Sequence, residues 1–472
     1  MKTAELLIDG HWEQGASSLE VHDRFDDELT AQVAQASPEQ VERAVGAAYS
    51  AGEPLHPHDR AAVLARASEL VEERRDVLVD LIIRDTGFTI SDAQTEVTRT
   101  IQTLQISSEE SKRIHGHMVP VDGAPRVRGR LGFTIRVPVG VVCAITPFNS
   151  PLNTVAHKIG PALAAGNSVV LKPAGVTPLS ATALCKILLD AGLPSPFLQL
   201  VHGSGSIIGP FLLEDERIAF YTFTGSTEVG EQILRTVGLR RTQLELGAIS
   251  PTIICADADV STAVPKIVQG AFRKAGQVCT SVQRLLVEDQ ILDDLINALV
   301  PATQELVAGD PRNPSTSVGP VISEKEADRI EHWIDEAVAG GAEMLVGGKR
   351  KGEVIFPTIL RNPRPDSKVV CEEIFGPVIT IEPVPSLEQA IGKINDGPYG
   401  LAAGLFTNDL SRALRSASSL HMGCLYINET SSARLDLIPY GGVKRSGFGK
   451  EGPRYAIEEM TEERFISITY DD

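Results

Sequence analysis

The spacing of apolar residues in the amino-terminal part of the chain indicates helices. Ser37 and Pro38 supply a capping residue and a first-turn proline, and apolar residues recur at helical spacing after them. The apolar positions of this first segment are Val41, Ala44, Val45 and Ala48. We expect a helix from Pro38 and further helices up to about Arg113. Before them, apolar residues on both sides of Asp9-Gly10 predict a β-hairpin, because both turn positions accept a positive φ.

The pattern changes after this helical region. Residues 126–138 alternate apolar and basic positions, which is typical of an edge or partner-facing strand. From 138 onward, short apolar runs alternate with helical stretches, and this alternation predicts a parallel sheet covered by helices. The runs expected as strands are 139–145, 168–172, 220–223 and 252–255, and a helix is expected over 178–190. The fold class is therefore predicted to be α/β.

Composition narrows the classes of protein and partner. A chain of 472 residues with 42% hydrophobic content can form two or three domains. The net charge of -18, from 62 acidic and 44 basic residues, argues against a nucleic acid or an acidic membrane as partner. The amino terminus lacks the apolar core of an export signal, and no apolar run reaches the roughly 18 residues of a spanning helix.

The cysteines indicate a reducing environment. They lie at positions 143, 185, 255, 279, 371 and 424, with no CxxC pair among them. Such spacing indicates neither a disulfide framework nor a zinc ribbon, and no metal site is expected. We expect reduced thiols in a cytoplasmic protein.

Two short stretches carry candidate covalent chemistry. Cys279 lies in the stretch 276–281, and Glu245 begins the sequence Glu245-Leu246-Gly247. A thiol attacks as a thiolate, and a carboxylate with a pKa near neutrality can activate the water that later releases an acyl group. The alternative is that Cys279 packs as a small core residue, as unpaired cysteines commonly do.

A nucleotide site is indicated where a predicted strand meets a predicted helix. Gly225 and Gly230 lie at that junction, where backbone amides and the positive end of a helix accept a pyrophosphate. Their spacing is not that of the Gly-x-Gly-x-x-Gly fingerprint, so a plain helix-start turn is the alternative. Lys172 ends an earlier strand and either meets the ribose or its phosphate or is simply solvated.

Seven stretches, in order along nearly the whole chain, carry a resemblance to one family. They are Thr146-Pro147-Phe148-Asn149, Lys172-Pro173-Ala174, Phe223-Thr224-Gly225-Ser226, Glu245-Leu246-Gly247, Gly276-Gln277-Val278-Cys279, Glu372-Glu373-Ile374-Phe375-Gly376-Pro377 and Pro439-Tyr440-Gly441-Gly442. With these stretches the chain resembles the aldehyde dehydrogenase superfamily. The resemblance implies a nicotinamide-dependent oxidation of an aldehyde to a carboxylic acid.

The resemblance also implies roles for particular residues. Cys279 would be the nucleophile and Glu245 the general base, while the side-chain amide of Asn149 and the backbone N–H of Cys279 would form the oxyanion hole. The implied route passes through a thioester that water hydrolyses, so the product is a free acid rather than an ester of coenzyme A. Lys158 and Glu462 match a proton relay, with surface ion-pair residues as the alternative.

The cofactor implied by the resemblance is NADP or NAD. The residues implied to bind it are Ile145, Thr146, Pro147, Phe148, Lys172, Ala174, Gly175, Gly225, Ser226, Val229, Leu246, Gly247, Glu373 and Phe375. Many NAD-preferring members carry Glu at the position of Gly175, where it repels a 2′-phosphate. We expect use of NADP or of both nucleotides. The alternative is that Gly175 only tightens a turn and NAD still binds better.

The substrate implied is a small, anionic aldehyde. Arg99 and Arg434 match basic positions of relatives that oxidise phosphorylated or phosphono aldehydes, and two guanidinium groups can clamp an anionic tail. Many such relatives also carry Arg immediately before the nucleophile, where this chain has Val278. His157 and Thr280 are further candidates for the substrate funnel, although His157 also fits a core position. The alternative for the two arginines is a helix-face ion pair and a loop residue.

Candidate substrates are phosphonoacetaldehyde, glyceraldehyde 3-phosphate or a semialdehyde, with a neutral hydroxyaldehyde such as lactaldehyde as the alternative. From another class, the alternative is a non-catalytic member that keeps the scaffold for binding. The resemblance implies a Rossmann-like cofactor-binding domain over 1–117 and 139–247 and an α/β catalytic domain over 248–454. Small β oligomerisation segments over 118–138 and 455–472 imply a homodimer or homotetramer.

Overall fold

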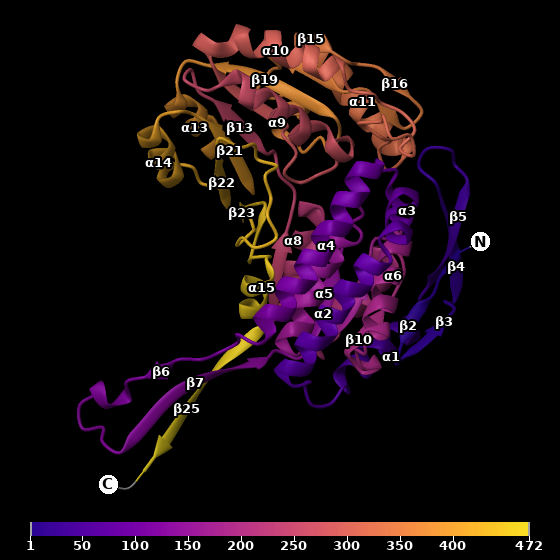
Figure 1. The fold of residues 1–472 in the computed structure, drawn as a ribbon, viewed down its shortest axis with the longest axis vertical. Coiled ribbons are helices and arrows are strands. Elements are labelled where there is room, and N and C mark those ends of the chain that lie inside the picture. Colours follow the sequence, from indigo (N-terminus) through magenta and orange to yellow (C-terminus); the bar gives the residue numbers. More distant parts are fainter. Residues whose placement is uncertain (1, 471–472) are drawn as a thin grey trace.

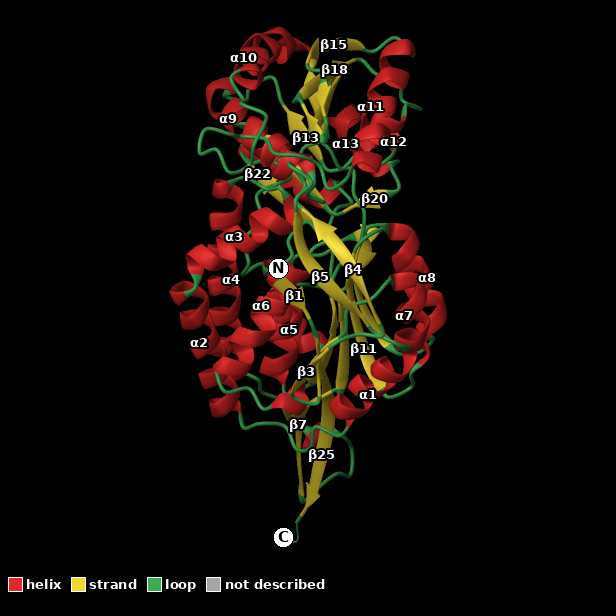
Figure 2. Ribbon diagram, turned by 90° about the vertical axis from the view of Figure 1, so that its right-hand side faces the viewer, coloured by secondary structure: helices red, strands yellow, loops and turns green. Residues whose placement is uncertain are grey.

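The structure is a computed structural model and describes residues 2–470. Two lobes, each built on one large sheet, lie one above the other in Figure 1, and an arm of strands projects from the lower lobe. Helices flank the sheets on both sides in Figure 2. The predicted α/β fold class is confirmed. No helix within residues 2–470 is long and apolar enough to cross a membrane.

The lower lobe holds an eight-stranded sheet with a parallel centre. In sheet order its strands are β24 (Gly447–Phe448), β12 (Arg241–Glu245), β11 (Ile218–Thr224), β8 (Val141–Ile145), β9 (Ser168–Lys172), β10 (Leu198–Leu200), β2 (Leu6–Ile8) and β3 (His11–Glu13). The five strands from β12 to β10 run parallel, and the apolar runs of three of them, β8, β9 and β11, had predicted strands there. The helices of this lobe are α1 (Pro38–Tyr49), α2 (Pro57–Glu73), α3 (Arg75–Thr86), α4 (Ile90–Ser111), α5 (Asn153–Ala165), α6 (Pro178–Asp190), α7 (Gly205–Glu214) and α8 (Thr227–Val237).

The upper lobe holds a seven-stranded sheet. In sheet order its strands are β15 (Glu343–Val346), β18 (Thr358–Arg361), β19 (Val378–Val384), β14 (Arg284–Glu288), β13 (Pro251–Ile254), β21 (Ala402–Phe406) and β22 (Cys424–Ile427). All neighbours are parallel except β15 and β18. The helices after residue 259 are α9 (Val260–Phe272), α10 (Leu292–Gln304), α11 (Glu324–Ala339), α12 (Lys368–Cys371), α13 (Leu387–Asn395), α14 (Leu410–Ser419) and α15 (Pro453–Glu459).

The chain returns to the lower lobe after the upper sheet is complete. Strand β24 pairs antiparallel with β12, so that Gly447 lies opposite Glu245. Helix α15 then packs on α5 and α4. This return carries the segment from Tyr440 to Glu451 past the end of β12, between the two sheets, where the candidate site lies.

The arm consists of β6 (Met118–Val119), β7 (Arg130–Pro138) and β25 (Thr461–Thr469). β7 pairs along its whole length with β25 and near one end with β6. β7 is therefore not an edge strand, because the carboxy-terminal strand, remote in sequence, covers one of its sides. The alternative, a partner-facing strand, stays a prediction. Minor strands elsewhere are β1 (Lys2–Ala4), β4 (Ser17–His22), β5 (Leu29–Gln35), β16 (Arg350–Lys351), β17 (Val354–Ile355), β20 (Tyr399–Gly400) and β23 (Val443–Lys444).

Local predictions near the amino terminus are confirmed. β2 and β3 form the expected hairpin, and both Asp9 (φ 48) and Gly10 (φ 79) adopt the left-handed conformation that this turn requires. Helix α1 starts at Pro38, and the side chains of Ser37 and Gln40 form a reciprocal capping box. Its buried residues are Val41, Ala44, Val45 and Ala48, the four apolar positions of the sequence pattern.

Candidate active site

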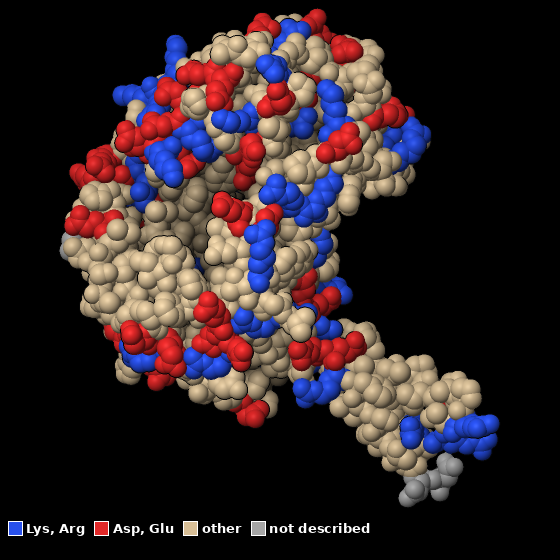
Figure 3. Space-filling view, turned by 180° about the vertical axis from the view of Figure 1, so that it is seen from behind, with Lys and Arg blue, Asp and Glu red and all other residues tan. Residues whose placement is uncertain are grey.

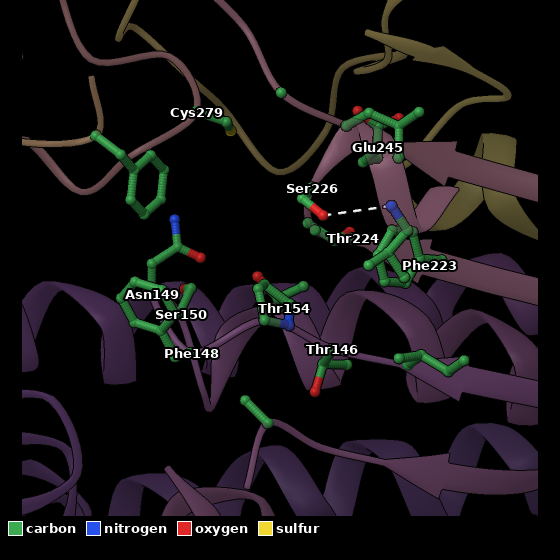
Figure 4. Close-up of a pocket in the computed structure, with 18 of the residues that line it drawn as sticks. Thr146, Phe148, Asn149, Ser150, Thr154, Phe223, Thr224, Ser226, Glu245 and Cys279 are labelled. Atoms are coloured by element: carbon green, nitrogen blue, oxygen red, sulfur yellow. Dashed lines mark hydrogen bonds between the residues drawn. The ribbon is translucent and has the colours of Figure 1, made fainter. Parts of the chain in front are cut away.

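One cavity of about 880 Å³ brings together residues of both lobes. The lower lobe contributes the carboxyl ends of β8, β11 and β12, the edge at which ligands bind in open parallel sheets. The upper lobe contributes the loop that carries Cys279. Cys279, Glu245 and Asn149 all line this cavity, and Figure 4 shows their side chains around it. Residues 34 to 130 positions apart in sequence thus share one space.

The loop before Cys279 is held in an unusual backbone conformation. After α9 the chain forms a 3₁₀ turn, η3 (Arg273–Gly276), in which Lys274 (φ 52), Ala275 (φ 53) and Gly276 (φ 71) are all left-handed. A Cβ on Gly276 would lie 2.0 Å from the carbonyl oxygen of Gly376, so only glycine fits at this contact. The close approach fixes the nucleophile loop against the Glu373–Gly376 segment.

A buried ion pair also anchors this loop to the lower lobe. Lys274 Nζ donates to Glu96 Oε2 on α4 at 2.6 Å and to the backbone carbonyl of Asn149 at 2.9 Å. Glu96 in turn accepts from the backbone N–H of Leu152 at 2.9 Å. The side-chain amide of Asn149 donates to the carbonyl of Gln277 at 2.8 Å. These bonds hold Asn149 beside the loop that presents Cys279.

The thiol of Cys279 has one hydrogen-bond partner within residues 2–470. Its Sγ lies 3.1 Å from the hydroxyl oxygen of Tyr440. Burial raises the pKa of the Cys279 thiol to about 11, while the hydrogen bond with Tyr440 and the charge of Arg434 act to lower that pKa. The thiol therefore favours its protonated form at neutral pH, and hydrogen-bond donors and positive charge favour its ionisation.

Glu245 ends β12 with its carboxyl group buried and without a hydrogen-bond partner in the described chain. Burial raises the pKa of Glu245 well above its ordinary value, and the neighbouring charge of Glu451 raises it further, against the charges of Arg434 and Lys158. Buried carboxyl groups are normally hydrogen-bonded. An unpartnered one in a cavity is therefore suited to take a proton from a water molecule.

The carboxylate that pairs with Lys158 is Glu451. The prediction that Glu462 is the carboxylate of a proton relay with Lys158 was therefore wrong. Lys158 is fully buried and donates to Glu451 Oε1 at 3.1 Å and to Thr222 at 3.0 Å. Glu462 lies exposed on β25, opposite Val137 of the arm. The pairing of β25 with β7 places Glu462 in the arm, and it does not line the cavity.

The predicted cofactor residues gather at one end of the cavity. Those that line it are Ile145, Thr146, Pro147, Phe148, Lys172, Ala174, Gly225, Ser226, Val229, Leu246, Gly247, Glu373 and Phe375. Gly175 is not among them. Ser226 caps α8 by accepting from the backbone N–H of Val229 at 3.4 Å, the bond drawn in Figure 4. Gly230 lies in α8, and a Cβ there would lie 2.3 Å from the side chain of Leu246, so glycine lets α8 approach β12 closely.

This end of the cavity fits a nicotinamide dinucleotide. Lys172 is 7% exposed, and its ammonium group has only the carbonyl of Pro173, at 3.5 Å, as a partner in the described chain. A buried cation without a carboxylate is suited to an anionic ligand. A Cβ on Gly175, three positions after this lysine, would have nothing within 4 Å, so a larger side chain has room there. The amino end of α8 adds a positive helix dipole for phosphate groups.

Glu373 and Phe375 lie where the cofactor end meets Cys279. Glu373 accepts from the backbone N–H of Ala248 at 3.0 Å, and burial raises the pKa of its carboxyl group to about 7. Phe375 is left-handed (φ 49) and packs edge-to-face on Phe148 at a centroid distance of 5.8 Å. This ring pair crosses between the lobes and narrows the cavity beside the thiol.

Of the predicted substrate residues, Arg99, Arg434 and Thr280 line the cavity, but both arginines already have carboxylate partners. Arg99 donates to both oxygens of Asp436, at 2.6 and 3.1 Å. Arg434 donates to Glu451 at 2.5 Å. The ion pair of Arg99 fits the alternative interpretation, and a clamp of the two guanidinium groups on an anionic tail stays a prediction.

His157 does not line the cavity. It is 2% exposed, and its Nε2 lies 2.7 Å from Asp436 Oδ1. Burial lowers the pKa of His157, although its contact with Asp436 opposes this effect. The side chain therefore fits the core alternative, and it supports the carboxylate that holds Arg99.

Arg273 is a cavity residue that the sequence did not reveal. It lines the cavity six positions before Cys279, and its guanidinium group donates to the hydroxyl of Ser432 at 3.1 and 2.9 Å. Within residues 2–470 it forms no ion pair. Burial lowers the pKa of Arg273, and the charge of Arg99 acts in the same direction. Arg273 thus lines the cavity without an ion-pair partner in the described chain, although the charge of Asp92 acts to raise its pKa.

The fold and this cavity define an oxidoreductase of the dinucleotide-dependent, thiol-containing type. Residues 12–466 match the model of the aldehyde dehydrogenase family, and the chain belongs to that family. It is an enzyme that oxidises an aldehyde to a carboxylic acid with NAD or NADP. The predicted family, enzyme class and cofactors are confirmed.

Several relatives are similar over nearly their full length. A 3-sulfolactaldehyde dehydrogenase of Priestia aryabhattai is 47% identical, over 99% of this chain and 98% of the relative. A lactaldehyde dehydrogenase of Methanococcus maripaludis strain C7 is 38% identical, over 88% of both chains. The crystal structure of NADP-dependent glyceraldehyde-3-phosphate dehydrogenase from Bacillus halodurans C-125, complexed with NADP, is 34% identical with a TM-score of 0.96, over 99% of this chain and 100% of that one.

Proposed function

We propose that the enzyme oxidises a small aldehyde with an anionic tail, and 3-sulfolactaldehyde in particular, to the corresponding carboxylate. The observation that carries this proposal is the guanidinium group of Arg273, which lines the cavity and forms no ion pair within residues 2–470. A sulfonate is a permanent anion at neutral pH, and a guanidinium group binds such an anion through two parallel N–H donors. The relative at 47% identity, described as a 3-sulfolactaldehyde dehydrogenase, supports the same substrate.

In the proposed mechanism the Cys279 thiolate attacks the aldehyde carbon. The backbone N–H of Cys279 and the side-chain amide of Asn149 donate to the oxyanion that forms. Asn149 is suited to this role because its amide already faces the Cys279 loop through its bond to the Gln277 carbonyl. When bound at the Lys172, Ser226 and Glu373 end of the cavity, the nicotinamide supplies the hydride acceptor.

Release of the acid depends on Glu245. Its unpartnered carboxylate removes a proton from a water molecule, which attacks the thioester carbonyl and frees the Cys279 sulfur. The proton then passes toward the buried pair of Glu451 and Lys158, whose charges both act on Glu245. We propose Glu451 and Lys158 as the proton relay in place of Lys158 and Glu462.

We further propose that the enzyme accepts both NADP and NAD. Lys172 supplies a buried positive charge, and the side-chain space at Gly175 is empty, so no carboxylate opposes a 2′-phosphate there. The six cysteines are unpaired, which supports a cytoplasmic location. The division into domains at 1–117 with 139–247, 248–454, and 118–138 with 455–472 remains our proposal.

The arm supports a homodimer or homotetramer. Apolar side chains that it leaves exposed are Met118, Leu131, Ile135, Phe465, Ile468 and Tyr470. Figure 3 shows the arm standing clear of the body of the molecule, with basic side chains gathered near its tip. An exposed apolar surface of this kind is suited to be buried against a second subunit.

A neutral hydroxyaldehyde such as lactaldehyde is the second candidate substrate. It is favoured by the pairing of Arg99 with Asp436 and of Arg434 with Glu451, which leaves fewer free positive charges in the cavity. The relative from Methanococcus maripaludis, described as a lactaldehyde dehydrogenase, supports this candidate.

The ratio of kcat/KM for 3-sulfolactaldehyde to that for lactaldehyde distinguishes the two. In Arg273→Met we expect kcat/KM for 3-sulfolactaldehyde to fall by about ten- to a hundredfold, as for loss of about 1.4 to 2.8 kcal/mol of binding, with lactaldehyde changed less than about threefold. Arg99→Gln is the matched control, since its charge is already balanced, and it is expected to affect both substrates alike. Equal losses of both substrates in Arg273→Met would overturn the anionic assignment.

A further inference from the structure

The hydroxyl group of Tyr440 contacts only the candidate nucleophile. Its oxygen lies 3.1 Å from Cys279 Sγ, and it makes no other hydrogen bond within residues 2–470. The side chain is 1% exposed. A buried hydroxyl group normally has a hydrogen-bond partner, and the partner of this one is the sulfur atom of Cys279.

The backbone fixes the phenol in this position. The N–H of Tyr440 donates to Glu451 O at 3.2 Å, and the N–H of Glu451 donates back to Tyr440 O at 2.6 Å. The Arg434 guanidinium group lies 3.9 Å from the centroid of the Tyr440 ring and is itself held by Glu451. The phenol is thus placed by the same segment that supplies the carboxylate beside Lys158.

Packing alone does not require the hydroxyl. The ring of Tyr440 forms a small apolar cluster with Ala248 and Leu401. A phenylalanine ring would fill this cluster equally well, because only the oxygen atom differs. The oxygen therefore acts on Cys279 and not on the stability of the cluster.

Ionisation of the thiol fixes the direction of the hydrogen bond. In the neutral pair, either the S–H or the O–H can donate. Once the thiol has lost its proton to solvent, sulfur can only accept, so the phenol must donate. Burial raises the pKa of Tyr440 well above its ordinary value, and the phenol keeps its proton over the working pH range. The other charged or titratable groups around Cys279 are Arg273, Arg434, Glu245, Glu373, Tyr426 and Cys424.

We propose that Tyr440 is a catalytic residue whose hydroxyl donates a hydrogen bond to the Cys279 thiolate and so increases the population of the nucleophile. A charge-assisted hydrogen bond to a thiolate favours the ionised form directly. Glu245 and Glu373 bring negative charge toward the sulfur and oppose its ionisation. The hydroxyl offsets part of that opposition without adding a charge that would bind the product.

The test measures the thiol itself. This inference rests on the proposed role of Cys279 as nucleophile, but alkylation by iodoacetamide, in which the thiolate displaces iodide, needs neither substrate nor cofactor. In Tyr440→Phe we expect the apparent pKa of Cys279 to rise by about one unit, and its alkylation rate at pH 7.5 to fall about tenfold. Mass spectrometry of the Cys279 peptide across pH 6 to 10 gives the alkylation rate below the pKa of the thiol, where the rate follows the thiolate fraction and a pKa one unit higher lowers it about tenfold at every pH. Exposed Cys371 in the same sample is the internal control and is expected to react unchanged.

A second replacement moves the pKa in the opposite direction. Site-specific 3-fluorotyrosine at position 440 keeps the ring and strengthens the donor, because its phenol is more acidic, so the apparent pKa of Cys279 is expected to fall. Coincident alkylation profiles for the wild type and Tyr440→Phe would overturn the proposal. So would a fluorotyrosine protein whose Cys279 pKa is unchanged or raised. Neither result would decide whether the enzyme oxidises aldehydes, because steady-state turnover measures that activity separately.

Discussion

Removal of the Lys274 ammonium group is predicted to lower both the stability of the fold and the rate of the reaction. In Lys274→Met the chain keeps a side chain of similar length but loses the bonds to Glu96 at 2.6 Å and to the carbonyl of Asn149 at 2.9 Å. Methionine is unbranched at Cβ like lysine, so the left-handed backbone at this position (φ 52) is strained to the same degree in both proteins.

The magnitude follows from the burial of the partner. Glu96 is 2% exposed, and in the variant its carboxylate keeps only its bonds from the backbone N–H groups of Leu152 and Asn153. Breaking a buried pair by removing one partner costs about 3–5 kcal/mol. Asn149 loses its anchor as well, and a small displacement of a reacting group lowers rates by up to about a hundredfold. We expect both a lower free energy of unfolding and a lower kcat.

The assay is urea unfolding followed by tryptophan fluorescence, together with steady-state kinetics. The two tryptophans report on different lobes, since Trp12 lies in β3 and Trp333 in α11. Glu96→Gln and the double variant complete a mutant cycle. Because the double variant has no unpaired charge, it should be less destabilised than the sum of the single variants, by about 1–3 kcal/mol. Additive losses, or a Lys274→Met protein that unfolds at the wild-type urea concentration, would refute this reasoning.

Two further outcomes are expected. The pKa of Glu245 is raised, and the base acts in its deprotonated form. The rate of thioester hydrolysis in single turnovers should therefore fall as the pH drops through that raised pKa, well above the range of an ordinary glutamate. A rate independent of pH between 5 and 8 would contradict the role of Glu245. The structure has room for the side chain of Gly175→Glu. In this variant kcat/KM with NADP should fall by about tenfold or more, while kcat/KM with NAD changes little. An unchanged ratio of kcat/KM with NADP to kcat/KM with NAD would contradict the proposed site.

Features set by neighbouring residues could be predicted from the sequence. Strand β9 and helix α6 have the bounds that their apolar patterns indicated. The Asp9-Gly10 hairpin followed from turn chemistry alone. The stretches around Asn149, Glu245 and Cys279 were recognisable because each is a short run of characteristic residues, and the structure brings them to one cavity.

Features that depend on residues distant in sequence could not be predicted from the sequence. Glu451 and Lys158 are 293 positions apart, and nothing in either local sequence distinguishes Glu451 from Glu462. Arg99 is balanced by Asp436, 337 positions away, so its sequence context gave no sign that its charge is not free. The converse holds for Arg273, since the absence of a carboxylate partner becomes visible only when the lobes are packed together.

The most direct test of the covalent mechanism is mass spectrometry of Glu245→Gln after mixing with 3-sulfolactaldehyde and NADP. Glutamine cannot remove a proton from water, so hydrolysis should stall and the Cys279 peptide should gain the mass of the acyl group. Cys279→Ser is the matched control and should gain none. An unmodified Cys279 in a Glu245→Gln enzyme that still reduces the nucleotide at the wild-type rate would contradict the account.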